Sequence, residues 1–267
     1  MSAAALLERV EAYLDEVPRA AATVEDHGSM RLFVGTGAWP YYGRPRPGHG
    51  PVTPEDIALV LARQRELGAP EKLEWVAETT PSAEGAARAA GLQVTRFGLL
   101  VLDRPLAAAP VAGITVRLLE ADDRELPATQ AAIMVGFGHP GTAAGVAGVR
   151  EREHEQAARD RRSDVFMAHQ IRAGHAVMAV AEDADGPVCG GTALPRGAVS
   201  ELVGIATLPA ARRRGIAALV VAALVDAVAA RGVTTTFMGA ADDDVARVYR
   251  RVGFRPFATA CEAAPPR

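Results

Sequence analysis

Hydrophobic and polar residues follow two periods along this chain, one typical of helices and one typical of strands. The clearest helical pattern covers Ile216 to Val228, where apolar residues stand at i, i+3, i+4, i+7 and i+8, and Gly232 is a suitable stop. Similar patterns predict helices at residues 2–16, 53–68, 82–91, 123–135, 150–162 and 242–253. Apolar runs between turn residues predict strands at 30–35, 72–78, 92–103, 114–120, 233–239 and from 254 to about 261. Three more strands are expected between 175 and 209, and Asp185-Gly186 is a hairpin turn between the first two.

The two halves of this pattern repeat the same order of elements. In each half a strand, a loop, a helix, a strand and a short helix are followed by a glycine and a last strand. The closing segments, 86–94 and 245–256, also resemble each other. We therefore expect two related domains, at residues 1–106 and 114–267, joined by a linker at 107–113. One large mixed domain is the alternative.

Composition narrows the class of protein. The chain has 267 residues, 49% of them hydrophobic, which is enough for a sizeable core, and a formal net charge of -3. The lack of a basic excess argues against nucleic-acid binding. Neither Cys189 nor Cys261 belongs to a CxxC pair, which favours a reducing compartment and provides no metal-ligand spacing. The N-terminus lacks a signal-peptide pattern, and the run from Ile216 to Ala230 is too short to span a bilayer. We therefore expect a cytoplasmic protein with no metal and no membrane partner.

The turn before the long helix combines three arginines with a glycine. The segment Leu208–Gly215 reads LPAARRRG and follows a predicted strand. The first amides of a helix have no intrahelical partner, and the helix dipole adds partial positive charge there. Gly215 lets an anion reach the main chain, and forked donors for phosphate oxygens come from Arg212, Arg213 and Arg214. The turn therefore predicts a phosphate site. A solvated basic turn that caps a buried helix is the alternative.

Two motifs in the second half resemble those of a known family. Arg212, Gly215 and Ala217 match, in order, the Q/R-x-x-G-x-G/A signature for acetyl-CoA in the GNAT superfamily of N-acetyltransferases. The later segment 246–254 resembles the family's closing A-x-x-x-Y-x-x-x-G-F motif. The resemblance covers about residues 114–263, and the first half shares only the order of elements. It implies an α/β fold of the α+β type, with a mixed, mostly antiparallel twisted sheet flanked by helices, in a tandem of two related domains.

The resemblance also implies a set of cofactor contacts. The acyl donor is expected to be acetyl-CoA, with its pantetheine arm between two diverging strands. Main-chain groups of Ile205, Ala206 and Thr207 would face that arm, and Gly204 would allow close approach or a bulge. The pyrophosphate would lie on the amides of the turn, those of Arg213, Arg214, Gly215, Ile216, Ala217 and Ala218. Asp242 stands where many members carry an asparagine that contacts the cofactor, and it is also a suitable helix cap.

The chemistry implied by the resemblance is direct attack of an amine on the thioester. Tyr249 would protonate the leaving thiolate as general acid, and Glu201 would accept the proton of the amine, directly or through water. A main-chain N–H near Ile205 or Ala206 would polarise the thioester carbonyl. Period two places Glu201 on the same strand face as Val203 and Ile205. The alternatives are a tyrosine that only packs against the sheet and a carboxylate that only faces water.

The first half lacks the corresponding chemistry. When the two closing segments are aligned on their glycines, Ala87 stands opposite Tyr249. The loop before the long helix of the first half is rich in proline, which lacks the amides that a pyrophosphate needs. We expect this half to have no catalytic competence and to pack beside the second domain. Trp39, Tyr41 and Tyr42 are candidates for a wall of the substrate cleft, although aromatic residues are more commonly part of a core.

Three other functions compete with acyl transfer. GFGHPG at 136–141 matches the dinucleotide fingerprint G-x-G-x-x-G, but it follows a helical pattern and contains Pro140, so we expect it to border the path of the amine. A non-catalytic acyl-CoA-binding or partner-binding module is the second, and DNA binding through the three arginines, disfavoured by an acidic pI, is the third. The expected partner is a small-molecule or peptide amine, whose identity and the oligomeric state are open.

Overall fold

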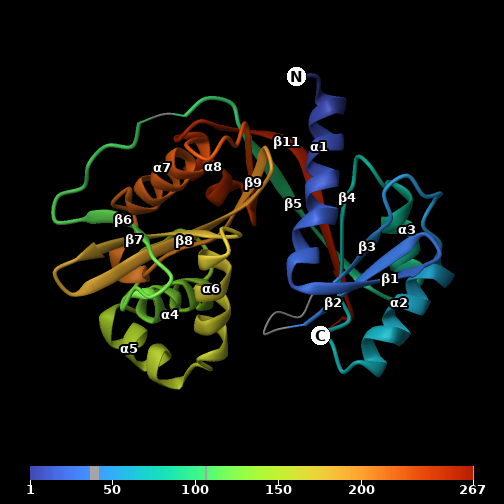
Figure 1. The fold of residues 1–267 in the computed structure, drawn as a ribbon, viewed down its shortest axis with the longest axis horizontal. Helices are drawn as coiled ribbons and strands as arrows, with labels where there is room; N and C mark the ends of the chain where they lie inside the picture. The colour runs from blue at the N-terminus through green and yellow to red at the C-terminus, as the bar shows by residue number, and fades with distance from the viewer. Residues whose placement is uncertain (37–41, 106, 267) are drawn as a thin grey trace. The chain divides into compact units, whose positions relative to one another are not determined.

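Packing divides the helices and strands of the chain into two units (Figure 1). The structure is a computed structural model, and it describes residues 1–36, 42–105 and 107–266. Unit 1 comprises Met1–Leu99 and Pro256–Arg267, and unit 2 comprises Leu100–Arg255. This division differs from the expected boundary at 107–113, because the chain leaves unit 1 earlier and returns to it with its last strand.

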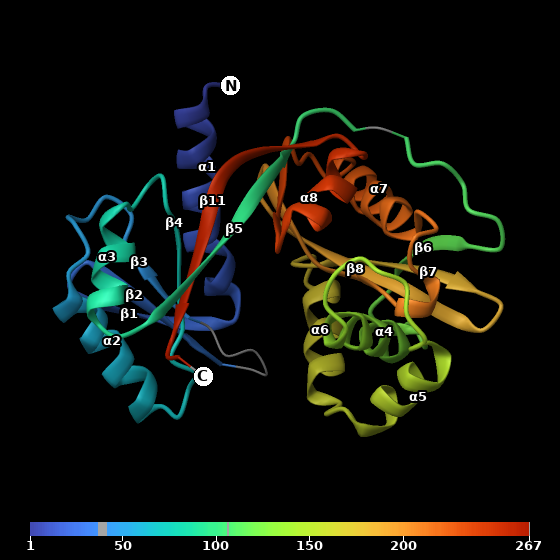
Figure 2. The same ribbon diagram turned by 180° about the vertical axis from the view of Figure 1, so that it is seen from behind.

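Unit 1 has the strand order β1-β2-β3-β4-β11-β5. Its strands are β1 (Ala22–His27), β2 (Met30–Gly35), β3 (Gly43–Pro45), β4 (Leu73–Val76) and parts of β5 (Gln93–Leu102) and β11 (Phe254–Ala264). Its helices are α1 (Ala3–Glu16), the short η1 (Val17–Ala20), α2 (Pro54–Glu66) and α3 (Ser82–Ala89). The helices α2 and α3 lie side by side (Figure 2), and their apolar residues share a core with Leu32, Leu73 and Trp75 of the sheet.

Unit 2 has the strand order β5-β10-β9-β8-β7-β6. Its own strands are β6 (Thr115–Leu119), β7 (Val177–Asp183), β8 (Gly186–Arg196), β9 (Val199–Thr207) and β10 (Thr235–Ala240). Its helices are α4 (Leu126–Gly138), α5 (Val149–Ala158), α6 (Arg162–Arg172), the short η2 (Pro209–Ala211), α7 (Ile216–Ala229) and α8 (Asp243–Arg250). In both views α7 and α8 cover one face of this sheet, and α4, α5 and α6 cover the other (Figures 1 and 2).

Most neighbouring strands are antiparallel, and each unit also contains a parallel pair, β3 with β4 and β9 with β10. The expected fold class, a mixed and mostly antiparallel sheet flanked by helices, is confirmed. The hairpin between β7 and β8 is also confirmed, but Asp183 pairs with Gly186, so its two turn residues are Ala184 and Asp185 and not the expected Asp185-Gly186.

The strands β5 and β11 explain where the chain divides. The C-terminal part of β11 pairs antiparallel with β4 inside unit 1, where Cys261 lies opposite Trp75. The C-terminal part of β5 belongs to unit 2, where Leu100 joins the same core as Tyr249 and Phe254. Each unit therefore completes its sheet with a strand from the other half of the sequence.

Several elements differ from the sequence-based expectation. No strand was predicted at β1 or β3, and β3 lies within the proline- and glycine-rich loop. The charged helix ends at Ala158, and a separate helix α6 follows it. The GFGHPG motif begins in the last turn of α4, which runs to Gly138. The dinucleotide alternative is therefore wrong, because that fingerprint needs a strand before its glycines and a helix after them.

Candidate functional site

The turn between β9 and α7 exposes a row of main-chain amides. Gly215 begins α7 with a left-handed φ of 85°, and no side chain caps this helix. Among the described residues, no hydrogen bond uses the amides of residues 213–217, whereas the amide of Ala218 donates to the carbonyl of Gly215 at 3.1 Å. Residues 213–215 are exposed. Unpaired amides at a helix N-terminus attract an anion, so five of the six predicted amides are free to do so.

The backbone of this turn is unusual before it reaches Gly215. Arg213 has a φ of 67°, in the left-handed region that non-glycine residues avoid. Such a conformation costs about 1–2 kcal/mol, and strained residues of this kind cluster at ligand sites. Successive amides around left-handed residues form concave anion sites in proteins. The turn therefore has the backbone form of an anion site as well as its free donors.

The guanidinium of Arg212 is used within the protein. It donates to four main-chain carbonyls, those of Thr207 (3.2 Å), Gly136 (2.8 Å), His139 (2.7 Å) and Ala143 (3.2 Å). Burial lowers the pKa of this half-buried arginine. Arg212 stands at the first position of the family signature, but its side chain joins the turn to the segment that follows α4.

The other two arginines of the turn differ from Arg212. Arg214 donates to the carbonyl of Ala112 at 3.3 Å and is exposed. Arg213 is also exposed, and within the described chain it makes no hydrogen bond or ion pair. Arg213 is therefore the arginine whose charge is most available to an anion on the amides.

The parallel strands β9 and β10 diverge as they approach this turn. Their pairing begins with Val199 opposite Thr235 and ends with Leu202 opposite Met238, although β9 continues to Thr207. Residues 203–207 are all half-buried, even though β9 lies between β8 and β10 in the sheet. The edge of β9 that contains Ile205, Ala206 and Thr207 is thus unpaired toward β10 among the described residues. An unpaired strand edge offers N–H and C=O groups to an extended ligand.

Gly204 places a β-bulge in this unpaired part of β9. Gly190 of β8 pairs with Ala206 and Thr192 pairs with Val203, so β9 contains one more residue than β8 between the two pairs. Gly204 has a φ of 64°, a conformation that glycine adopts at no steric cost. Of the two roles expected for Gly204, close approach or a bulge, the structure shows the bulge.

The bulge changes which side chains of β9 share a face. Ile205 packs on the α7 side, since a Cβ on Gly191 would lie 2.8 Å from Ile205 Cγ1 and 3.1 Å from Val220 Cγ1. Half-buried Glu201 pairs with Leu194, which alternates to the opposite face, the one that α4 covers. The expected common face of Glu201 and Ile205 is therefore wrong, because the extra residue of the bulge reverses the alternation.

Tyr249 lies in the core on the α7 and α8 side of the sheet. Its side chain is 7% exposed, and its ring makes an edge contact with Phe254 at 6.5 Å between centroids. Burial, with a smaller contribution from the Cys189 thiol, raises the pKa of Tyr249, so the phenol is protonated at neutral pH. The Thr207 hydroxyl, at the end of β9, donates a hydrogen bond to Cys189 Sγ at 3.2 Å. Because Cys189 interacts with the Tyr249 phenol, the phenol lies near the end of β9. Burial raises the pKa of Cys189 to about 12, so this thiol is not a nucleophile at neutral pH.

Asp242 begins α8 as a helix cap. Its carboxylate accepts a hydrogen bond from the amide of Val245 at 2.8 Å, and its side chain is exposed. The capping role is confirmed, and a contact with the cofactor stays a prediction.

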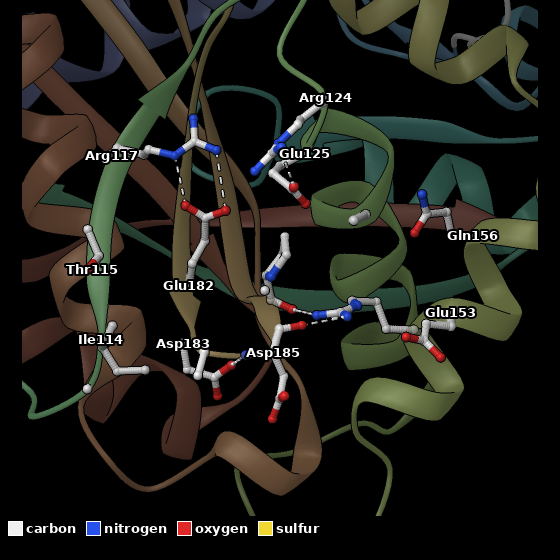
Figure 3. Close-up of a pocket in the computed structure, with 16 residues that line it drawn as sticks. Ile114, Thr115, Arg117, Arg124, Glu125, Glu153, Gln156, Glu182, Asp183 and Asp185 are labelled. Atoms are coloured by element: carbon white, nitrogen blue, oxygen red, sulfur yellow. Dashed lines mark hydrogen bonds and ion pairs between the residues drawn. The ribbon is translucent and has the colours of Figure 1, made fainter.

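A pocket of about 1100 Å³ in unit 2 is lined by none of the predicted site residues (Figure 3). It lies between β6, the β7–β8 hairpin and the helices α4 and α5. Arg117 pairs with Glu182 at 2.7 Å (Figure 3). Buried Arg152 donates to the carbonyl of Pro187 at 2.8 Å. Both guanidinium groups are bound within the protein, although Arg152 Nε is buried without a hydrogen-bond partner. The pocket shares no residue with the turn, the β9 edge or Tyr249.

Metal-binding groups and membrane-spanning helices can be considered for the described residues only. No group of His, Cys, Asp or Glu among them could hold a metal ion, and no helix among them is long and apolar enough to cross a membrane. Trp39 and Tyr41 lie outside the described residues. Tyr42 is half-buried, with its ring 6.5 Å from that of Phe33 in unit 1, and its role in a cleft wall stays a prediction.

Comparison with known proteins bears on the fold. The profile of the FR47-like protein family matches residues 191–262, a range that includes Gly215 and Tyr249. A GCN5-related N-acetyltransferase from Kribbella flavida superposes with a TM-score of 0.73 at 20% identity, over 98% of this chain and 96% of that one. The chain has the GNAT fold.

Two other GNAT structures are similar over both units. A putative acetyltransferase of the GNAT family from Novosphingobium aromaticivorans has a TM-score of 0.56 at 15% identity, over 95% of each chain. A tandem GNAT protein from the clavulanic acid biosynthesis pathway has a TM-score of 0.55 at 15% identity, over 89% of this chain and 79% of that one. A search of curated proteins finds no match.

Sequence reasoning missed two features of the region around the turn. The four carbonyls around Arg212 come from three segments, and a motif match does not reveal where a side chain points. Cys189 belongs to no CxxC pair and so did not attract attention in the sequence, yet it contacts Thr207 and lies near Tyr249. The pairing of Cys189 with Thr207 across β8 and β9 is the signal that would have found it.

Proposed function

We propose that unit 2 contains an N-acetyltransferase site, which transfers an acetyl group from acetyl-CoA to a primary amine in a ternary complex. The observation that supports it most is the presence of three features in one unit: free turn amides, an unpaired edge of β9, and the buried phenol of Tyr249. Taken singly, each feature has a structural explanation. Together they meet the needs of a diphosphate, an extended amide-containing arm and a leaving thiolate.

The acyl donor would be held chiefly by main-chain groups. The amides of residues 213–217 would donate to the diphosphate, and the guanidinium of Arg213 would add charge from the rim. Ile205, Ala206 and Thr207 would pair with the pantetheine arm along the edge that β10 leaves free. A main-chain N–H at the bulge near Gly204 would donate to the thioester carbonyl, where negative charge develops.

The two candidate catalytic side chains lie on opposite faces of the sheet. Glu201 belongs to the face that α4 covers, and Tyr249 to the face that α7 and α8 cover. A thioester in the gap between β9 and β10 would therefore be attacked from the Glu201 side and would release its thiolate toward Tyr249. Glu201 would accept the ammonium proton, directly or through water, and Tyr249 would donate a proton to the thiolate. The raised pKa of Tyr249 keeps the proton on the phenol until that step.

The N-terminal half would be a degenerate GNAT-like domain, and residues 114–267 would be the catalytic domain. Ala87, at the position that corresponds to Tyr249, is fully buried and offers no proton. We also propose a reducing, cytoplasmic compartment, which the two free, buried cysteines support.

The experiment that tests this function is the release of free thiol from acetyl-CoA in the presence of a panel of amines. The panel contains polyamines, amino acids, aminoglycoside-type amines and peptides with a free N-terminus. We expect thiol release with at least one class, and calorimetric binding of acetyl-CoA without any amine. Binding without release from any amine would favour the alternative, a non-catalytic acyl-CoA-binding module. Absence of binding would remove the phosphate site itself.

A further inference from the structure

The glycine-rich segment at residues 136–148, which begins in the last turn of α4, packs closely on the end of β9 and on η2. A Cβ added at Gly136 would lie 2.8 Å from the Cβ of Ala206. A Cβ at Gly145 would lie 3.1 Å from that of Pro209, and one at Gly148 would lie 3.3 Å from that of Ala210. Real Cβ atoms rarely come so close, so these glycines are needed for the approach of the two segments. Of the glycines that match the nucleotide fingerprint, Gly136 thus has a packing reason, whereas a Cβ at Gly138 or Gly141 would meet open space.

Hydrogen bonds also join the glycine-rich segment to the turn. The amide of Gly145 donates to the carbonyl of Pro209 at 3.1 Å, and the amide of Ala210 donates to the carbonyl of Ala147 at 2.9 Å. Arg212 adds bonds to the carbonyls of Gly136, His139 and Ala143, as described above. One guanidinium therefore contacts both the beginning and the middle of the segment.

The position of Arg212 suits a connector better than a phosphate ligand. The carbonyl of Gly136 belongs to the last turn of α4, where carbonyls lack helical partners and the dipole is negative. Among the described residues Arg212 has no carboxylate partner, so its charge is balanced by carbonyl oxygens. Arginine presents several donors in a rigid fork, which lysine cannot reproduce.

We propose that Arg212 is a positioning residue that ties the glycine-rich segment to the turn that holds the acyl donor. The proposal rests on the function proposed above. α4 and the segment that follows it belong to the Glu201 face, from which the amine would approach. Arg212 thus sets the position of the segment that borders the amine relative to the turn that holds the acyl donor. Arg213 contacts the phosphate groups.

Hydrogen–deuterium exchange tests this connection without any substrate. The variants are Arg212→Ala, Arg212→Lys and the matched control Arg213→Ala, which removes the same charge from the neighbouring position. We expect residues 136–148 to exchange about tenfold faster in Arg212→Ala, less so in Arg212→Lys, and at the wild-type rate in Arg213→Ala. Peptides from α7 serve as the internal reference for global stability. Wild-type exchange of the segment in both Arg212 variants would overturn the proposal. If Arg212→Ala does not fold, Arg212→Lys alone decides in the same way.

Kinetics separate positioning from a merely structural role. With an amine that supports thiol release, we expect Arg212→Ala to raise the KM for the amine about tenfold and to leave the Kd for acetyl-CoA within about threefold. Arg213→Ala should raise the Kd for acetyl-CoA and leave the KM for the amine nearly unchanged. A loss of acetyl-CoA affinity in Arg212→Ala with an unchanged amine KM would assign Arg212 to the phosphate and overturn the proposal. If no amine supports turnover, the proposed function fails, whereas the exchange result still decides whether Arg212 holds the segment.

Discussion

The turn that leads from a strand into a long helix is built in opposite ways in the two units. In unit 1, Thr53 Oγ1 accepts a hydrogen bond from the amide of Asp56 at 3.2 Å, and Pro54, which has no N–H, occupies the first position of α2. In unit 2, Gly215 begins α7, and no side chain accepts from the first amides. The helix start is therefore satisfied by the protein in unit 1 and is left open to an anion in unit 2.

The start of the next helix also differs between the units, but here the capped helix is the one in unit 2. In unit 1 the amide of Val52 donates to Ser82 Oγ at 3.0 Å, which joins the loop before α2 to the start of α3. The corresponding start of α8 in unit 2 is capped by its own Asp242. Where unit 2 has Tyr249, unit 1 has a fully buried alanine. A binding site needs donors that the protein does not use, whereas a packing domain gains stability when every donor is used.

The largest effect is expected from Tyr249→Phe, which makes unit 2 resemble unit 1 in its lack of an acid. The ring and its packing against Phe254 are kept, and only the hydroxyl is lost. We expect kcat to fall about 100-fold, because a positioned general acid contributes that much or more, while the Kd for acetyl-CoA is unchanged. Steady-state kinetics and calorimetry measure the two quantities. An unchanged kcat would remove Tyr249 from the mechanism.

The second-largest effect is expected from Gly215→Val, which places a branched side chain at the start of α7. Valine is poorly compatible with a φ of 85°, so the amides of the turn would be displaced. We expect acetyl-CoA affinity to fall about tenfold, as measured by calorimetry. Gly232→Val is the matched control, because Gly232 follows the same helix with a φ of 87° and open space around it. Equal losses in both variants would mean that the effect is one of helix stability and not of the anion site.

Thr53→Ala removes the cap that closes the helix start of unit 1. We expect a loss of about 1 kcal/mol in the free energy of unfolding, measured with denaturant, and no change in acetyl-CoA affinity. Thr53→Ser keeps the hydroxyl and is expected to lose less. A gain or loss of acetyl-CoA affinity in the alanine variant would contradict the contrast between the two turns, since it would give the unit 1 turn a part in binding.

The smallest effect concerns an ion cluster that holds the last strand in unit 1. Lys72 Nζ lies 2.9 Å from carboxylate oxygens of both Glu74 and Glu262, which face each other on β4 and β11. Burial raises the pKa of Glu74, so the folded state holds this proton more tightly than the unfolded state does. Its contribution to stability therefore falls as the pH rises through and above the usual range of a glutamate.

Lys72→Met removes the cation that opposes this rise of the Glu74 pKa. We expect a loss of about 1 kcal/mol or less in the free energy of unfolding near neutral pH, after allowance for solvent screening, and a smaller loss in mild acid. Denaturant unfolding of wild type and variant at the two pH values measures it. Lys72→Arg keeps the charge and is the control. A loss that is equal at both pH values would show that packing, and not the cluster, holds the strand.

The backbone form of the unit 2 turn, a helix start without a side-chain cap, could be predicted because its signals are local. A glycine at the helix start, three arginines before it and the cap at Asp242 are read within a few positions of one another. The bulge at Gly204 and the hairpin between β7 and β8 are local in the same way. The two strands missed in unit 1 carry charged residues and prolines, so no apolar run marked them.

The directions of side chains could not be predicted in the same manner. The family signature contains Arg212 as well as Gly215, but only the folded chain brings the carbonyls of residues 136–143 within reach of that guanidinium. The relative faces of Glu201 and Ile205 depend on the bulge at Gly204, whose extra residue a period of two does not include. One extra residue moves every later side chain to the other face.

The sequence by itself determined the order of most elements, the glycine at the start of α7 and the GNAT resemblance, because helix periods, caps and turn residues act over short distances along the chain. Only the tertiary structure decided that β11 pairs with β4, that β5 ends in the core of unit 2, and that Arg212 is bound to carbonyls. The physical reason is that a strand edge can pair with any other strand edge, and an arginine can donate to any carbonyl within reach. Which of these partners is used depends on the packing of segments that are far apart in the sequence.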